Sequence, residues 1–171
     1  MSRQAYNIIE LLRKLKSKDI IPGKKKFQKL VYLVENEGNV KLGFNYEIHF
    51  YGPYSSELDN VLVELGGEGL IYYDYQGSSH LICVNELNED DDFYKTDLTD
   101  DELQSIERIF SIFGNRTPNE LELLTTAHFA FQKLQDKSTP NIINGVKKIK
   151  GEKYTDAEIE QALKEFTNLK S

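Results

Sequence analysis

Hydrophobic residues recur at helical spacing over the first part of the chain. Apolar side chains spaced i, i+3, i+4 and i+7 predict amphipathic helices over residues 3–16, 24–37 and 55–65. The dipeptide Pro22-Gly23 separates the first two of these segments. We therefore expect three helices before residue 66.

The last third of the chain carries clear helix-start signals. Thr99, Thr117 and Thr155 are each followed three residues later by a glutamate. In this capping box, the threonine and glutamate side chains satisfy backbone N–H groups at the helix start. An apolar stripe follows each box, and Thr139-Pro140 opens a shorter helix that ends near Gly151. We expect four helices here.

Two segments between these groups of helices predict strands. Residues 44–51 alternate between apolar and polar side chains, which is typical of a half-buried strand that Gly52-Pro53 should end. Residues 70–75 and 80–84 are rich in aromatic and β-branched side chains and flank a Gly-Ser-Ser turn. They predict an antiparallel hairpin.

The order of elements predicts an α+β fold that is mainly α-helical with a small antiparallel β-sheet. Helix, strand, helix and hairpin follow one another in a winged-helix-like order, and a C-terminal helical portion comes after them. We expect a first domain at residues 1–85, an acidic linker or loop at 86–98, and helices at 99–171 packed on the first part.

Composition indicates a globular protein. Of 171 residues, 39% are hydrophobic and 11% aromatic, enough to bury a substantial core. The N-terminal residues have charges within their apolar pattern, and no apolar run approaches the roughly 20 residues of a membrane helix. A single cysteine, Cys83, cannot form an internal disulfide. We expect a cytoplasmic protein without a secretory signal or membrane contact.

The net charge of −7 is unevenly distributed along the chain. Residues 1–42 hold ten Lys or Arg and four Asp or Glu, whereas residues 43–94 hold eleven Asp or Glu and no Lys or Arg. Blocks of like charge attract complementary surfaces. We therefore expect the acidic surface around residues 51–75 to favour a protein partner with a basic surface.

A winged-helix order raises the question of DNA binding. The helix that would enter the major groove and the hairpin beside it lie in the block without Lys or Arg, so they lack the cations that neutralise phosphates. The alternative is a nucleic-acid-binding regulator that uses the basic N-terminal helices, with contacts from Lys24, Lys25, Lys26 and Lys29.

No set of residues forms a recognisable catalytic or metal site. The three histidines lack metal-ligand spacing, and His128 falls on an apolar stripe that favours a hydrogen-bonded core position. Ser55 lies outside any nucleophile-elbow motif and suits helix capping. We expect no enzyme activity, cofactor or metal. A hydrolase acting through His49 remains a remote alternative and requires a deep polar cleft there.

A family resemblance is carried by Lys-x-x-Lys-Leu-Val-Tyr-Leu at residues 26–33, Tyr-Gly-Pro-Tyr-Ser at 51–55, Glu57-Leu58 and Gly-Leu-Ile at 69–71. The segment of residues 5–85 resembles the Panacea-type antitoxin domain and YwgA-like bacterial proteins. The resemblance implies an interchangeable module that neutralises toxins by direct binding, or an adaptor that delivers a partner to a protease. Many YwgA-like proteins have no assigned function.

The residues of the second motif also favour protein binding by their own chemistry. Two tyrosines flank the Gly-Pro pair, and tyrosine gives a large contact area for little loss of rotamer entropy. We predict partner contacts from Tyr51, Gly52, Pro53, Tyr54, Ser55 and Glu57. The alternative is that both tyrosines only support the corner between strand and helix.

Overall fold

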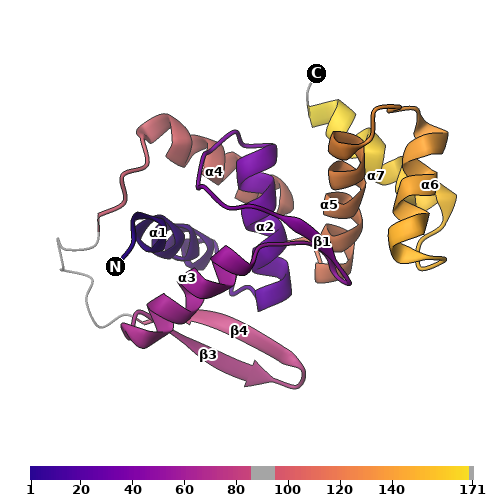
Figure 1. The fold of residues 1–171 in the computed structure, drawn as a ribbon. Coiled ribbons are helices and arrows are strands. Elements are labelled where there is room, and N and C mark those ends of the chain that lie inside the picture. Colours follow the sequence, from indigo (N-terminus) through magenta and orange to yellow (C-terminus); the bar gives the residue numbers. More distant parts are fainter. Residues whose placement is uncertain (86–94, 170–171) are drawn as a thin grey trace.

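The computed structural model describes residues 1–85 and 95–169, which form seven helices and four short strands (Figure 1). The elements are, in chain order, α1 (Arg3–Ser17), α2 (Lys24–Asn36), β1 (Glu47–His49), β2 (Gly52–Tyr54), α3 (Ser56–Gly67), β3 (Ile71–Gln76), β4 (Ser79–Val84), α4 (Asp100–Phe113), α5 (Pro118–Lys133), α6 (Thr139–Lys150) and α7 (Asp156–Leu169). The α+β class and the helical segments are as predicted.

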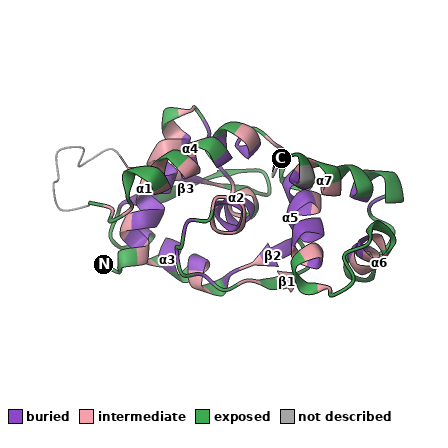
Figure 2. Cartoon of the chain, turned by 90° about the horizontal axis from the view of Figure 1, so that it is seen from above, coloured by how far each residue is buried: buried purple, intermediate pink, exposed green. Residues whose placement is uncertain are grey.

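Helix α2 is the central element of the fold. Seen nearly end-on in Figure 2, it is surrounded by other elements, and it packs against α4, α5, β2 and β4. Eight consecutive residues, Phe27–Val34, are buried. A helix buried on all sides must also bury any polar residues in its sequence. Gln28 and Lys29 are such residues, and each forms hydrogen bonds to a neighbouring element.

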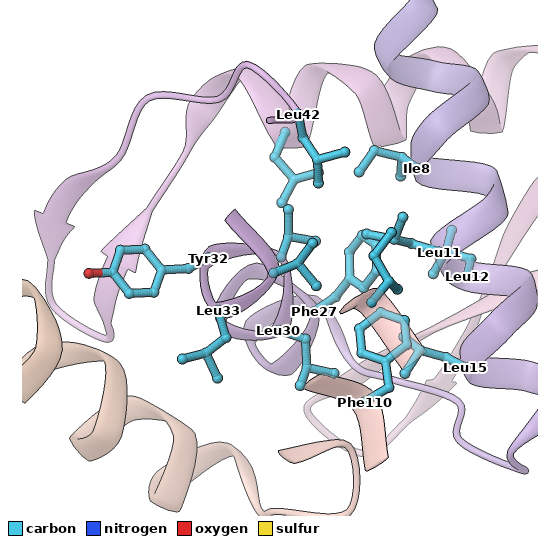
Figure 3. Packing of buried hydrophobic residues seen from close by; sticks show 14 of the residues in the cluster. Ile8, Leu11, Leu12, Leu15, Phe27, Leu30, Tyr32, Leu33, Leu42 and Phe110 are labelled. Carbon is cyan, nitrogen blue, oxygen red and sulfur yellow. The ribbon is translucent and has the colours of Figure 1, made fainter. Parts of the chain in front are cut away.

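The main hydrophobic core lies between α1, α2, α3 and α4. Leu11, Leu12 and Leu15 of α1 face Phe27 of α2, with Phe110 of α4 beside them (Figure 3). Each such side chain contributes about 1.5–3 kcal/mol on burial. Tyr32 projects from another side of α2, toward the β1–β2 hairpin and α5 (Figure 3).

A second, smaller core lies between the three C-terminal helices. It consists mainly of small and aliphatic side chains: Ala127, Ala130, Ile142, Val146, Tyr154, Ile159 and Ala162. Helix α5 belongs to both cores, because Leu121 and Leu124 of the same helix lie in the main core. The C-terminal helices are therefore joined to the first part of the chain through α5.

The single strand predicted over residues 44–51 is instead a hairpin. β1 ends at His49, the chain reverses at Phe50 and Tyr51, and β2 pairs antiparallel with β1, so that His49 faces Gly52 and Glu47 faces Tyr54. Gly52, with φ of +95°, begins the second strand rather than ending the first. Because of the reversal, the side chain of Phe50 is 82% exposed and does not share a buried face.

The β3–β4 hairpin follows α3 as predicted. Its register pairs Ile71 with Val84 and Gln76 with Ser79, so the turn is formed by residues 77–78. Within the described part of the chain, β1–β2 and β3–β4 are separate two-stranded sheets. The winged-helix-like order is therefore present in sequence, but no three-stranded sheet forms.

The C-terminal helix starts are capped as the sequence indicates. The boxes at Thr99, Thr117 and Thr155 all have both reciprocal hydrogen bonds, at 2.8–3.2 Å.

Most of the predicted acidic linker, residues 86–94, lies outside the described residues. The remaining part is attached to α1, because Thr96 Oγ1 donates to Asn7 Oδ1 at 2.6 Å. Over the described residues, none of the helices combines the length and apolarity that spanning a bilayer requires.

Candidate binding site at the first hairpin

A cavity of about 590 Å³ opens between the start of α2 and the tip of the β1–β2 hairpin. Ser78, Ser79 and His80 from the turn of the β3–β4 hairpin and Pro118 at the start of α5 complete its wall. We call it the hairpin cavity. Its volume is in the range of pockets that hold a small ligand or a few side chains of a partner.

The hairpin cavity brings together the two groups of residues that the sequence suggested for different functions. Its lining contains all four candidate nucleic-acid contacts, Lys24, Lys25, Lys26 and Lys29, and three candidate partner contacts, Tyr51, Gly52 and Tyr54. The lysines and the tyrosines are more than 20 residues apart in sequence, and they meet because β2 packs on α2. One surface therefore contains both basic and aromatic groups.

Much of the Tyr-Gly-Pro-Tyr-Ser motif is scaffold. Lys29 Nζ donates to the carbonyl oxygen of Pro53 at 2.7 Å. The Gln28 side-chain amide donates to the carbonyl oxygen of Ser55 and accepts from its backbone N–H, both at 2.9 Å. Gly52, Pro53 and Ser55 are buried, and a Cβ on Gly52 would lie 3.0 Å from Thr126 Oγ1. These residues hold the hairpin on α2, so that of the six predicted partner contacts only Tyr51, Tyr54 and Glu57 are open to solvent.

A buried charge cluster from the C-terminal helices supports the same hairpin. Glu122 of α5 accepts from Lys150 Nζ at 2.8 Å and from Lys153 Nζ at 3.0 Å, and the side chains of Glu122 and Lys150 are almost fully buried. Lys150 also donates to the carbonyl oxygen of Phe50 at the hairpin tip. Sequence reasoning did not identify Glu122, Lys150 or Lys153, because no local pattern links residues so far from the motif.

Burial shifts the pKa values of Lys29 and Glu122, which lie near each other, in opposite directions. It lowers the pKa of Lys29 to about 8, although the nearby Glu122 carboxylate partly opposes the shift. Burial alone would raise the pKa of Glu122, but hydrogen bonds from Lys150 and Lys153 hold it below its usual value. At neutral pH Lys29 and Glu122 are therefore mainly charged, with the Lys29 cation at the floor of the cavity.

The polar groups at the other end of the cavity bond to one another. Tyr54 donates to Asp59, and this hydrogen bond is the main cause that raises the pKa of Tyr54 to about 12. Gln28 also donates to Asp59, at 3.2 Å. His49 stacks on the Tyr54 ring at 4.5 Å between centroids, and half of its side chain is exposed. The hydroxyl of Ser55 caps α3 by accepting from the Leu58 amide, and Ser55 is fully buried.

Exposed aromatic rings form the rim of the cavity. Phe50 is 82% and Tyr51 43% exposed, and the two rings meet edge to face at 5.0 Å. Lys25 Nζ lies 3.4 Å from the centre of the Tyr51 ring, and Lys24 Nζ lies 5.2 Å from that of Tyr73. These cation–π contacts orient the two lysines without neutralising them.

The acidic residues between positions 51 and 75 lie on α3, directly after it and on β3. Glu64 accepts from the backbone N–H and hydroxyl of Ser2, and Glu57 accepts from Asn45. Glu68 and Asp74 are exposed. The acidic surface predicted around residues 51–75 would rest on these residues of α3 and β3, of which Glu68 and Asp74 are the most open to solvent.

His128 lies in the core, as its sequence position predicts. Its ring nitrogens are 2.8 Å from the Tyr32 hydroxyl and 2.6 Å from a Glu37 carboxylate oxygen, and its side chain is only 2% exposed. Over residues 1–85 and 95–169, no three His, Cys, Asp or Glu side chains gather closely enough to hold a metal ion.

Comparison with known proteins matches this chain to a family. The family model described as "Antitoxin SocA-like, Panacea domain" matches residues 27–130, which include most of the α2 motif, all of the Tyr-Gly-Pro-Tyr-Ser motif, α4 and most of α5. The chain is also 28% identical over 163 residues to the uncharacterized protein YwgA of Bacillus subtilis (strain 168), with 88% of each protein covered. The matched range contains Glu122 but ends before Lys150.

Proposed function

We propose that this chain, which belongs to the antitoxin SocA-like Panacea domain family, is a non-enzymatic protein-binding module, antitoxin-like or adaptor-like. The contact surface is the rim of the hairpin cavity together with the acidic face of α3 and β3. The bound partner is a protein with a basic surface opposite that face.

The observation that carries the proposal is the exposed aromatic pair at the hairpin tip. Large apolar side chains that are held in place and open to solvent are typical of interface hot spots. The backbone behind Phe50 and Tyr51 is fixed on one side by Lys150 and on the other by Lys29. The tip therefore loses little conformational freedom when a partner binds.

The arrangement of the polar groups supports a binding role over a catalytic one. The hydroxyls of Ser55 and Tyr54 are engaged in capping and in the Tyr54–Asp59 bond. The carboxylate beside His49, that of Glu47, lies on open surface with its side chain 86% exposed. Among the four lysines of the cavity, Lys29 is only 3% exposed and is too enclosed to contact the phosphates of a duplex. These placements favour a partner that reaches the rim and the cavity with side chains.

Affinity capture from the native host tests the proposal. The wild-type protein is expected to retain a defined protein partner at low and moderate salt. The Phe50→Ala/Tyr51→Ala variant should lose at least about tenfold in affinity, because a pair of hot-spot aromatics commonly contributes 2 kcal/mol or more. Reversing Glu68 and Asp74 to lysine should weaken capture most at low salt.

The matched control is Ile21→Ala, which removes another exposed large apolar side chain, between α1 and α2 and outside both the hairpin cavity and the acidic face of α3 and β3. This control should retain the partner. Recovery of no protein partner by the wild-type chain would contradict the proposal. Binding to nucleic acid in a gel shift that is lost on Lys24→Glu/Lys25→Glu/Lys26→Glu would favour the regulator alternative instead.

A further inference from the structure

The walls of the hairpin cavity carry more positive than negative charge, in contrast to the chain as a whole. Four lysines line it against one carboxylate, that of Asp59, in a protein whose net charge is −7. Asp59 already accepts hydrogen bonds from Tyr54 and Gln28. It is therefore poorly placed to neutralise the lysines across the cavity.

The lysines at the mouth are oriented but not paired with acids. Among the described residues, no carboxylate forms a salt bridge with Lys24 or Lys25, and both ammonium groups rest over tyrosine rings. An anion that enters the cavity can therefore bind them without breaking an existing ion pair. Binding of that anion therefore does not carry the cost of separating charges that are already paired.

The start of α2 adds to this positive potential. Gly23 occupies the N-cap position without a side-chain hydrogen bond, and the first turn contains no acidic residue. The N–H groups at a helix start carry partial positive charge that an anion stabilises. Residues 23–26 line the cavity, so this end of the helix opens onto it.

Lys29 adds a buried cation at the floor of the same cavity. Its ammonium group donates to Pro53 O at 2.7 Å, and burial disfavours its charged form. A negative group that enters the cavity would offset that cost. The cavity therefore has cationic groups at its mouth and floor, and exposed apolar rings at its rim.

We propose that the hairpin cavity receives an extended acidic segment of the protein partner, with a carboxylate between Lys24, Lys25 and Lys29 and an apolar side chain against Phe50 and Tyr51. This inference rests on the proposed function and names the part of the partner that enters the cavity. It is compatible with a basic surface elsewhere on the same partner, opposite the acidic face of α3 and β3.

Titration of the ¹⁵N-labelled full chain, followed by NMR, tests this proposal, because NMR detects affinities as weak as millimolar. The probe is an amidated heptapeptide that alternates aspartate with phenylalanine, and the comparison peptide has asparagine in place of aspartate. We expect saturable shifts concentrated on the residues that line the cavity. The acidic peptide should bind roughly tenfold or more tightly than the asparagine peptide.

Charge reversal at the mouth provides the matched pair of variants. Lys24→Glu/Lys25→Glu should reduce affinity for the acidic peptide by about tenfold or more. The control, Lys41→Glu/Lys148→Glu, makes the same change of charge at exposed lysines outside the cavity and should retain binding. Equal binding of both peptides, or shifts spread over surface lysines such as Lys41 and Lys148, would overturn the proposal.

Two further arms separate other anions from an acidic segment. If inorganic phosphate or a short oligothymidylate gives the same shifts at lower concentration than the acidic peptide, the cavity is a site for phosphate or nucleic acid and the proposal is wrong. Partner capture that depends on Phe50 and Tyr51 but not on Lys24 and Lys25 would also overturn it, while leaving the proposed function intact.

Discussion

At the scale of single residues, Lys29 shows how one side chain can belong to both the core and the site. Lys29 is only 3% exposed, and its ammonium group fixes β2 at Pro53 at the floor of the cavity. The charged groups that act on it are Glu122 of α5, Lys150 of α6 and Lys25 of its own helix. The attraction of one carboxylate does not fully offset burial, so the charged form of Lys29 is disfavoured.

The stability of the protein should reflect this buried cation. The pKa of Lys29 is lowered from 10.5 to about 8 in the folded state, so between those values the unfolded chain binds more protons and Lys29 makes the fold more stable as pH rises. The difference in unfolding free energy between wild type and Lys29→Met should shift in favour of wild type by roughly 1–2 kcal/mol from pH 7.5 to 9.5. Urea denaturation at both pH values measures it, and a difference that does not change with pH contradicts the assignment.

At the scale of elements, the β1–β2 hairpin depends on tertiary support. Its strands have three residues each, and an isolated hairpin of that length is not stable in water. Support comes from α2 through Gln28 and Lys29 and from α6 through Lys150. The close approach of these elements requires a glycine at the start of β2.

Substitution of Gly52 should therefore disturb the hairpin. Its φ of +95° is unfavourable for other residues, and an added Cβ would lie 3.0 Å from Thr126 Oγ1 and 3.4 Å from Lys29 Cε. We expect Gly52→Ala to lower the free energy of unfolding by about 2 kcal/mol. Gly67→Ala is the control: nothing lies within 4 Å of its added Cβ in α3, so this change should be neutral or stabilise by up to about 1 kcal/mol. Chemical denaturation distinguishes the two outcomes.

At the scale of the whole molecule, the C-terminal helices and the candidate site are coupled through one carboxylate. Glu122 lies on α5, the helix that both cores share, and it holds Lys150 and Lys153 beneath the hairpin tip. The helices after residue 133 therefore do more than cover α5. They also supply the cation that fixes the backbone of Phe50.

Neutralising Glu122 should loosen both the fold and the site. Glu122→Gln leaves Lys150 and Lys29 as buried cations without their carboxylate, which should cost about 3–5 kcal/mol. Hydrogen exchange should speed up at residues 47–54 as well as in α6. The control Glu160→Gln removes an exposed pair with Lys164 and should change stability by less than about 0.5 kcal/mol. Protection at residues 47–54 that is the same in both variants would show that the C-terminal helices do not support the hairpin.

The sequence by itself determined the helices, their caps, the β3–β4 hairpin and the core position of His128. These features follow from local rules: apolar periodicity marks the buried face, and a threonine-to-glutamate pair closes its own hydrogen bonds within one turn. The uneven charge and the family motifs were also visible there, because they are properties of the order of residues.

Only the tertiary structure decided how the motifs are used. Alternation over residues 44–51 predicts one strand, but a hairpin forms because buried groups from α2, α5 and α6 hold the reversal at Phe50 and Tyr51. The sequence suggests the lysines of α2 as nucleic-acid contacts, whereas packing of β2 on α2 places them around a cavity with the tyrosines. Glu122 and Lys150 could not be assigned to that site from sequence, because contacts between residues so far apart depend on the whole fold.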